Sequence, residues 1–245
     1  MDFMEKIALW GAIVNVLAVV GGGFLGLVLR HFLHGGEGKL GETMKKCSDA
    51  IMKGIGLCCM VIGISGALKS EKMLVMILSI IVGGILGTLL DLDGKISRLG
   101  NFLGEKLSGK GRKASDFSEG FVNATLLFCV GAMSIVGPME SGLLLVHTTQ
   151  YAKSIMDGVM AIVFASSLGV GVLFSGVSIL LYQGSLTLLA QWVQPILSDV
   201  VINEMSAAGS LLILGIGLNL AGITKLKLMN YVPAIFLPIL FCLFM

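Results

Sequence analysis

Apolar stretches long enough to cross a lipid bilayer recur along this chain, from Ile7 to its last residue. A membrane-spanning α-helix needs roughly 18 or more consecutive, mainly apolar residues. Only 13% of the 245 residues are charged and 56% are hydrophobic, whereas about 25% of an ordinary soluble domain is charged. We therefore predict an all-α integral membrane protein, a polytopic helix bundle with one transmembrane domain over residues 1–245.

We predict eight membrane spans, with boundaries accurate to a few residues. They lie at about 7–29, 50–68, 73–91, 119–137, 152–173, 176–195, 206–223 and 229–245. The fifth and sixth share one apolar tract, interrupted only around Ser175 and Gly176; if this interruption is a kink, they form one broken span. After Gly137–Pro138 the apolar run is too short to cross, which favours a re-entrant or surface segment.

Positive charge predicts the orientation, because Lys and Arg favour the cytoplasmic side of a membrane protein. Most of the 17 Lys and Arg residues fall at three connections, within residues 30–53, 95–113 and 225–227. The other side keeps Lys6, Lys69, Lys72 and Lys153. These three connections are therefore expected in the cytoplasm and both termini outside.

The longest polar connection, residues 92–118, contains apolar side chains spaced as one helical face. They are Ile96, Leu99, Phe102, Leu103 and Leu107. Because lysine and arginine flank this face, we expect the segment to lie on the anionic inner surface of the membrane. A plain solvated loop is the alternative, and residues 108–118 are expected to be flexible.

Several classes of function lack support in the sequence. The net charge of +2, without aromatic residues between the basic ones, argues against a nucleic-acid partner. The five cysteines have neither disulfide nor zinc-ligand spacing, and His31 and His34 lack a third ligand nearby. Gly104–Gly111 resembles a phosphate-binding loop but has Gly111 where magnesium binding needs Ser or Thr. We therefore expect no cofactor, no metal site and no enzymatic activity, and the N-terminus is expected to remain as the first helix.

Glycine accounts for 34 residues, about twice its usual share, and it falls inside the spans. The pairs Gly22/Gly26 and Gly83/Gly87 place small residues on one helical face, where another backbone can approach closely. Such faces pack spans of one chain together or, where they face lipid, form a homodimer. Similar glycine-interrupted segments further suggest that spans 1–3 and 6–8 are inverted-topology repeats, a plan found among secondary transporters.

Two carboxylates at membrane depth, Asp157 and Glu204, are the leading candidates for a functional site. A carboxylate at the bilayer centre costs roughly 2.5–3.5 kcal/mol on insertion scales, so it normally faces a bundle interior or an aqueous cavity. Asn203 and several small residues share the helix end that carries Glu204. We predict one polar cavity reached by both carboxylates. The alternative is that both cap helices at the outer interface.

Three asparagines, Asn15, Asn123 and Asn219, lie in spans close to glycines. An asparagine in a span can simply hydrogen-bond two helices together. Several of them beside glycine-weakened helices also offer amide and backbone oxygens, which hard cations such as Na⁺ require. We therefore include them, with Asp157, Glu204 and Asn203, among the predicted substrate- or ion-binding residues.

The order of segments across nearly the whole chain resembles the bacterial YqgA/YdfK-type multi-pass membrane proteins. The segments that carry the resemblance are AIVNVLAVVGGGFLG, GLCCMVIGISGAL, ILSIIVGGILGTLLDLDG, FVNATLLFCVGAMSIVG, YAKSIMDGVMAIVFASSLGVGVLFS, LYQGSLTLLA and VINEMSAAGSLLILGIGLNL. The resemblance implies a protein of the bacterial cytoplasmic membrane, in a family of unknown function called putative transport proteins. It brings no substrate and no functional residues.

Our leading hypothesis is a small secondary transporter, linked to protons or a cation such as Na⁺, for an unidentified small solute or ion. A channel with the same polar lining is the second hypothesis. A membrane scaffold or regulatory subunit without transport activity is the third.

Overall fold

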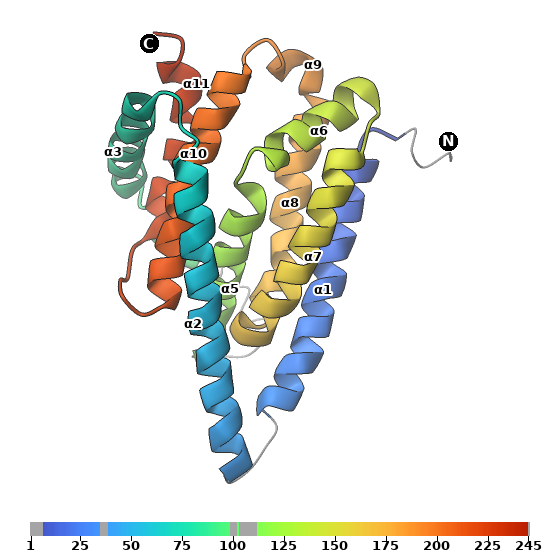
Figure 1. Ribbon diagram of the computed structural model, residues 1–245, viewed down its shortest axis with the longest axis vertical. Helices are drawn as coiled ribbons and strands as arrows, with labels where there is room; N and C mark the ends of the chain where they lie inside the picture. Colours follow the sequence, from blue (N-terminus) through green and yellow to red (C-terminus); the bar gives the residue numbers. More distant parts are fainter. Residues whose placement is uncertain (1–6, 35–38, 99–101, 103–111, 245) are drawn as a thin grey trace.

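The computed structural model describes residues 7–34, 39–98, 102 and 112–244, and these form a bundle of helices (Figure 1). The elements are α1 (Trp10–His34), α2 (Lys39–Ala67), α3 (Met73–Leu89), α5 (Arg112–Cys129), α6 (Met133–Leu144), α7 (Thr148–Leu168), α8 (Gly171–Leu188), α9 (Ala190–Val193), α10 (Asp199–Leu220), the 3₁₀ helix η2 (Leu228–Ile235) and α11 (Leu237–Phe241). A short helix, Leu92–Arg98, follows α3. Within the described ranges the chain forms no β-strand, so the prediction of an all-α membrane bundle is confirmed.

Five described helices are long and apolar enough to cross a membrane, namely α1, α2, α7, α8 and α10. The number rises to seven if each of two bent helix pairs counts as one span, compared with the eight that we predicted. The difference lies partly in the predicted last span, 229–245. Its described part forms η2 and the five-residue α11, with Pro233 inside η2 and Pro238 at the start of α11. Proline lacks the backbone N–H that a continuous helix needs, so a long helix does not form there.

The predicted fourth span, 119–137, is also broken, at an earlier place than Gly137–Pro138. Helix α5 ends at Cys129, and the chain turns by 61° before α6 begins at Met133. Gly131 lies at the break with a φ of 111°, a conformation that glycine adopts without strain. The Ser134 hydroxyl donates to the carbonyl oxygens of Phe128, in the last turn of α5, and of Val130, just after it. Carbonyl groups at a helix end need such partners, because the helix itself supplies none. Pro138 lies inside α6, and the helix continues past it to Leu144.

The predicted fifth and sixth spans are two separate helices, but the break between them falls at Gly169 rather than at Ser175–Gly176. Gly169 has a φ of 85° and ends α7. Ser175 and Gly176 lie inside α8, where both are buried. A glycine in a left-handed conformation, rather than a small-residue pair, therefore ends the helix.

The helices pack into two groups. The first bundle consists of α1, α5, α6, α7 and α8, and its most extensive contact joins α1 to α7. The second bundle consists of α2, α3, α10, η2 and α11, and its main contacts join α2 to α10 and α3 to η2. Contacts between the two bundles are sparse and involve chiefly α1 with α2, α2 with α7, and α5 with α10. In Figure 1 the second bundle stands at the left and the first at the right.

Glycines bring the helix backbones together inside each bundle. A Cβ at Gly22 of α1 would collide with the carbonyl oxygen of Gly158, so α1 and α7 are in backbone contact. In the second bundle, a Cβ at Gly63 would lie 2.5 Å from the backbone nitrogen of Leu214 of α10. Gly87 similarly faces the carbonyl of Asn230 in η2. Both predicted glycine faces, Gly22/Gly26 and Gly83/Gly87, therefore pack against helices of the same chain, as expected for small residues in lipid.

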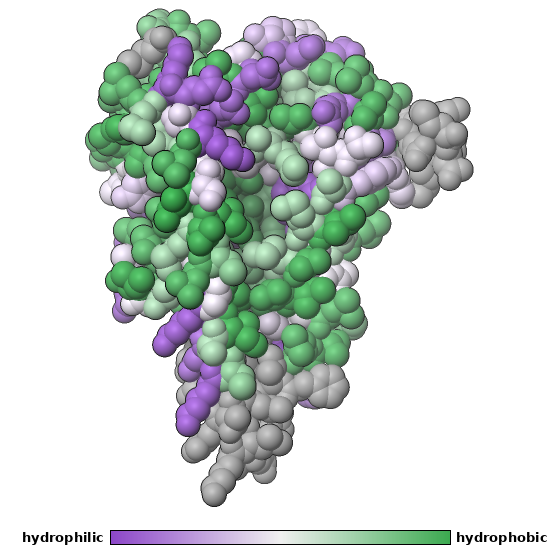
Figure 2. Space-filling model, in the orientation of Figure 1, coloured by the Kyte–Doolittle hydropathy of each residue, from purple (hydrophilic) through white to green (hydrophobic). Residues whose placement is uncertain are grey.

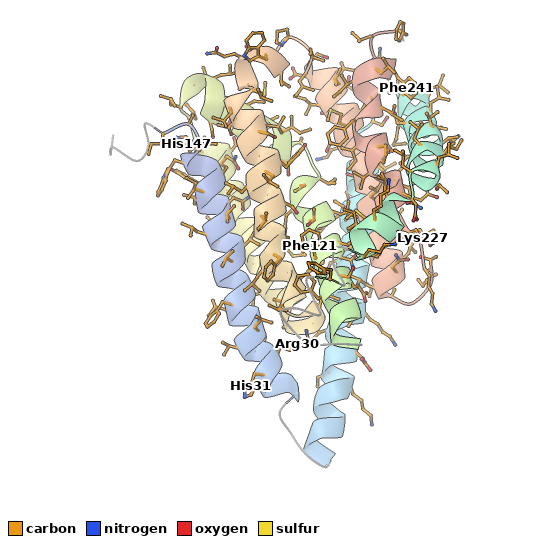
Figure 3. The ribbon with its side chains drawn as sticks, turned by 180° about the vertical axis from the view of Figure 1, so that it is seen from behind. Arg30, His31, Phe121, His147, Lys227 and Phe241 are labelled. Carbon is orange, nitrogen blue, oxygen red and sulfur yellow. The ribbon has the colours of Figure 1, made fainter. Side chains whose placement is uncertain are left out.

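The direction of the helices agrees with part of the predicted topology. Helix α1 begins, and α11 ends, at the end of the bundle opposite to the one where α1 ends and α2 begins (Figure 1). Figure 3 accordingly shows His147 and Phe241 near one end and Arg30 and His31 toward the other. Helices α2 and α10 are antiparallel, because Gly56 faces Gly217 and Gly66 faces Ser210. The inverted repeats require this relation, but the repeats and the orientation in the membrane stay predictions.

The predicted amphipathic helix in residues 92–118 is described only in part. Its first turns form the helix Leu92–Arg98, and Ile96 packs against the core. Phe102 is exposed. Leu99, Leu103 and Leu107 lie outside the described residues, as do residues 108–111 of the segment 108–118 that we predicted to be flexible. Residues 112–118 form the first turns of α5, and the flexibility of this connection stays a prediction.

Candidate functional site

The Lys153 cavity, about 550 Å³ in volume, lies in the crevice between the two bundles. Its walls come from α2, α7, α10 and the break between α5 and α6. The polar side chains in its lining are Ser65, Lys69, Ser134, Lys153, Asp157, Asn203, Ser206 and Ser210. It lies in the half of the bundle where α2 ends and α10 begins. Figure 2 shows a hollow on this face of the molecule, between the apolar surfaces of α2 and α7.

Asp157 is on the wall of this cavity and forms an ion pair with Lys153. The Lys153 ammonium donates a hydrogen bond to Asp157 Oδ1 at 2.9 Å and lies 2.7 Å from Oδ2. The two residues are one helical turn apart on α7, and their side chains are 7% and 9% exposed. Removing one partner of such a buried pair leaves an uncompensated charge. A change in the charge of either side chain at the cavity wall would therefore also affect the stability of α7.

Asn15 of α1 extends this polar group into the first bundle. Its amide nitrogen donates to Asp157 Oδ2 at 3.0 Å and to Gln183 Oε1 of α8 at 3.1 Å. Asn15 and Gln183 are both fully buried. One carboxylate is thus held by side chains from α7 and α1, and through Asn15 it is connected to α8.

Further buried amide atoms in the first bundle have no hydrogen-bond partner among the described residues. They are Asn15 Oδ1, Gln183 Nε2 and both polar atoms of the Gln150 amide. Gln150 lies on the same face of α7 as Asp157, two turns earlier, and it packs against Gly11 of α1. A buried polar atom without a partner costs about 1–3 kcal/mol. Because these buried amides cost stability, the packing of the helices alone does not explain their presence inside the first bundle.

Glu204 has different surroundings, although it is also fully buried. Its carboxylate accepts hydrogen bonds from the backbone N–H groups of Glu71 and Lys72, both at 2.7 Å, and from the Ser70 hydroxyl at 2.8 Å. These donors belong to the turn between α2 and α3. Glu204 therefore fixes that turn and the start of α3 to α10, and it does not line the Lys153 cavity.

Asn203 lines the Lys153 cavity and also contacts the α2–α3 turn. Its amide donates to the Glu71 carboxylate at 2.7 Å. The prediction of a cavity shared by Asp157 and Glu204 is therefore corrected: Asp157 and Asn203 share it, with Asn15 behind Asp157. Sequence neighbours such as Asn203 and Glu204 point in different directions on a helix, and the chain pattern alone does not say which one faces the cavity.

Asn219 and Asn123 lie elsewhere, beside a second cavity of about 610 Å³ that we call the Asn219 cavity. The Asn219 side chain closes the turn after α10: its Oδ1 accepts from the Leu226 N–H and the Thr224 hydroxyl, and its Nδ2 donates to the Leu226 carbonyl. Asn123 is buried on α5 and lines the same cavity. The other polar lining side chains are Asp93, Ser97, Ser118, Glu119, Thr224 and Lys225.

Sequence reasoning missed three residues of the polar group around Asp157. The charge count placed Lys153 on the outer side of the membrane and gave it no role in the site, although the Lys-x-x-x-Asp spacing puts both side chains on one helical face. Gln150 and Gln183 were not considered. Each is a polar residue within or beside an apolar span, the same signal that selected the asparagines.

Comparison with known proteins places the chain in a family. It belongs to the family described as "Protein of unknown function (DUF554)", which matches residues 10–243. The "Uncharacterized membrane protein YdfK" of Bacillus subtilis (strain 168) is 28% identical over 234 residues, 94% of each chain. The "Uncharacterized protein YqgA" of Escherichia coli (strain K12) is 28% identical over 231 residues, 93% of each chain. No solved structure matches. The family resemblance that the sequence suggested is thus confirmed.

Proposed function

We propose that this member of the family is a small secondary transporter that moves a small solute or ion across the bacterial cytoplasmic membrane. Transport would be linked to protons or to a cation such as Na⁺ through Asp157. The observation that carries the proposal is the Lys153 cavity, which lies between two bundles and has a buried ion pair in its wall. The proposal includes no enzymatic step.

The division into two bundles supports a transport cycle. Alternating access commonly consists of one helix bundle rocking against another around a site at their interface. Contacts between the two bundles are few here, whereas each bundle is held together by close backbone contacts at glycines. A relative movement would therefore change the crevice and leave each bundle intact.

The ion pair offers a route for coupling. A proton that binds the Asp157 carboxylate, or a cation that binds it in place of the Lys153 ammonium, removes the attraction between the two side chains. Asn15 would respond too, because its amide donates to the same carboxylate. Ion binding would thus be transmitted to α1, across the packing of the first bundle.

Purified protein in proteoliposomes tests this proposal. We expect steps of pH or Na⁺ concentration to evoke transient currents on a solid-supported membrane, and a panel of small organic solutes to contain one whose flux saturates and follows the ion gradient. Asp157→Asn keeps nearly the same shape but leaves the Lys153 ammonium without its counter-ion, so Asp157→Asn/Lys153→Met, which removes both charges, accompanies it. Both variants, once shown to be folded, should lose the gradient dependence. Flux that stays proportional to concentration and independent of the gradient would identify a channel. Folded, reconstituted protein without flux or currents would favour the scaffold hypothesis.

A further inference from the structure

The Lys153 and Asn219 cavities lie on the same two helices, toward opposite ends of the bundle. Helix α5 contributes Asn123 to the Asn219 cavity and Leu127 to the Lys153 cavity, one turn apart on one face. Helix α10 contributes Ile213 to the Lys153 cavity and Asn219 to the other. These two helices come from different bundles, so both cavities belong to the same crevice.

The layer that separates the cavities is thin. At about 1.5 Å per helical residue, Asn123 and Leu127 are roughly 6 Å apart along α5, and Ile213 and Asn219 roughly 9 Å apart along α10. The layer is also apolar. Leu127 and Ile213 are 9% and 4% exposed, and both belong to one hydrophobic cluster that also contains Ile216 and Leu220.

The two cavities carry similar chemistry on either side of this layer. The Lys153 cavity offers ammonium groups, a carboxylate, an asparagine amide and serine hydroxyls. The Asn219 cavity is lined by the Lys225 ammonium, the carboxylates of Asp93 and Glu119, the Asn123 amide and hydroxyls. A solute that hydrogen-bonds well in one cavity finds equivalent groups in the other.

We infer that the two cavities are the two vestibules of a single permeation route, divided by a septum of Leu127 and Ile213. The inference rests on the proposed function only in requiring that a solute crosses the membrane through this protein. It therefore holds for a channel as well as for a transporter. The ligand class that both vestibules fit is a small polar solute carrying a positive and a negative group. The Asn219 cavity is then a second binding site for the same solute.

Opening the septum tests the route. Liposomes with the Leu127→Ala/Ile213→Ala variant should take up urea, followed by stopped-flow light scattering, at least tenfold faster than liposomes with the unchanged protein. Leu126→Ala is the control, because Leu126 is buried on the same helix but lines an apolar cavity with Phe121 and Met229 and neither of the two vestibules. Urea permeation that does not increase in a folded double variant would overturn the inference.

A second measurement does not depend on the folding of that variant. In a background without the five native cysteines, Ser206→Cys reports on the Lys153 cavity and Ser97→Cys on the Asn219 cavity. A charged, impermeant methanethiosulfonate should label position 206 faster from one side of the membrane and position 97 faster from the other. Faster labelling of both from the same side would refute a route through the septum.

Protection against this labelling tests the solute class. Alanine carries both charges, propionate lacks the ammonium group and ethylammonium lacks the carboxylate. We expect alanine to slow labelling at both positions more than either single-charge analogue does at the same concentration. Equal protection by an analogue, protection at one position only, or none would overturn the assigned class. If the septum variant opens the route but the unchanged protein shows no gradient-coupled flux, the inference of a permeation route is supported and only the transporter proposal is refuted.

Discussion

The two carboxylates buried at membrane depth have different kinds of partners. Glu204 is surrounded by two backbone N–H groups and a hydroxyl of one turn. Asp157 faces an ammonium and an amide from side chains of two helices, beside a cavity. Backbone donors are fixed in place by the course of the turn, so they hold Glu204 in one arrangement, whereas side-chain partners can change rotamer. Burial of a carboxylate in a membrane protein therefore identifies a functional candidate only together with the nature of its partners.

The largest effect on stability is expected when Asp157 loses its counter-ion. Lys153→Met leaves a buried carboxylate without its cation, and breaking such a pair costs about 3–5 kcal/mol. Thermal unfolding in detergent should show the loss. Adding Asp157→Asn should restore most of it, because the unpaired charge is then gone. If the second substitution made the loss larger, the two side chains would not form the pair described.

Glu204→Leu tests the other carboxylate and should destabilise the protein by about 2–3 kcal/mol. The reason is that the donors of Ser70, Glu71 and Lys72 lose a charged acceptor. Hydrogen–deuterium exchange should rise in the α2–α3 turn and remain unchanged in α7. Increased exchange in α7 would mean that the two carboxylates belong to one network.

A smaller effect is expected at the break between α5 and α6, which forms part of the cavity wall. Gly131→Ala should cost about 1–2 kcal/mol, because alanine is strained at a φ of 111° even though no atom of the described residues lies within 4 Å of the added Cβ. Gly54→Ala is the control, since its Cβ would also meet nothing within 4 Å and Gly54 lies inside α2. Equal thermal stability of the two variants would show that the break tolerates a side chain.

The sequence was sufficient to predict the membrane class, the family and most of the long helices, because apolar length and glycine spacing act locally along the chain. It was insufficient at the breaks. Pro138 is accommodated inside α6, while the left-handed glycines Gly131 and Gly169 end helices, and many other glycines in the chain have no such role. Backbone conformation at a glycine depends on what the neighbouring helices leave free, which local sequence does not specify.

The candidate site could be predicted only in part for a related reason. Asp157 and Asn15 were selected by polarity at membrane depth, and the structure brings them into contact. Their grouping with Glu204 was wrong, because that grouping depends on which face of α10 meets the α2–α3 turn. The role of Lys153 was missed because charge counting treats a lysine near a span end as a surface residue.

The most direct test of the central claim compares Asp157→Asn with Glu204→Gln in the same proteoliposome assay. Both substitutions remove one negative charge and preserve side-chain shape, and only the first lies in the cavity wall. In protein shown to be folded, the currents evoked by pH or Na⁺ steps should disappear in Asp157→Asn and persist in Glu204→Gln. Currents that persist in Asp157→Asn, or that disappear only in Glu204→Gln, would contradict the assignment of coupling to Asp157.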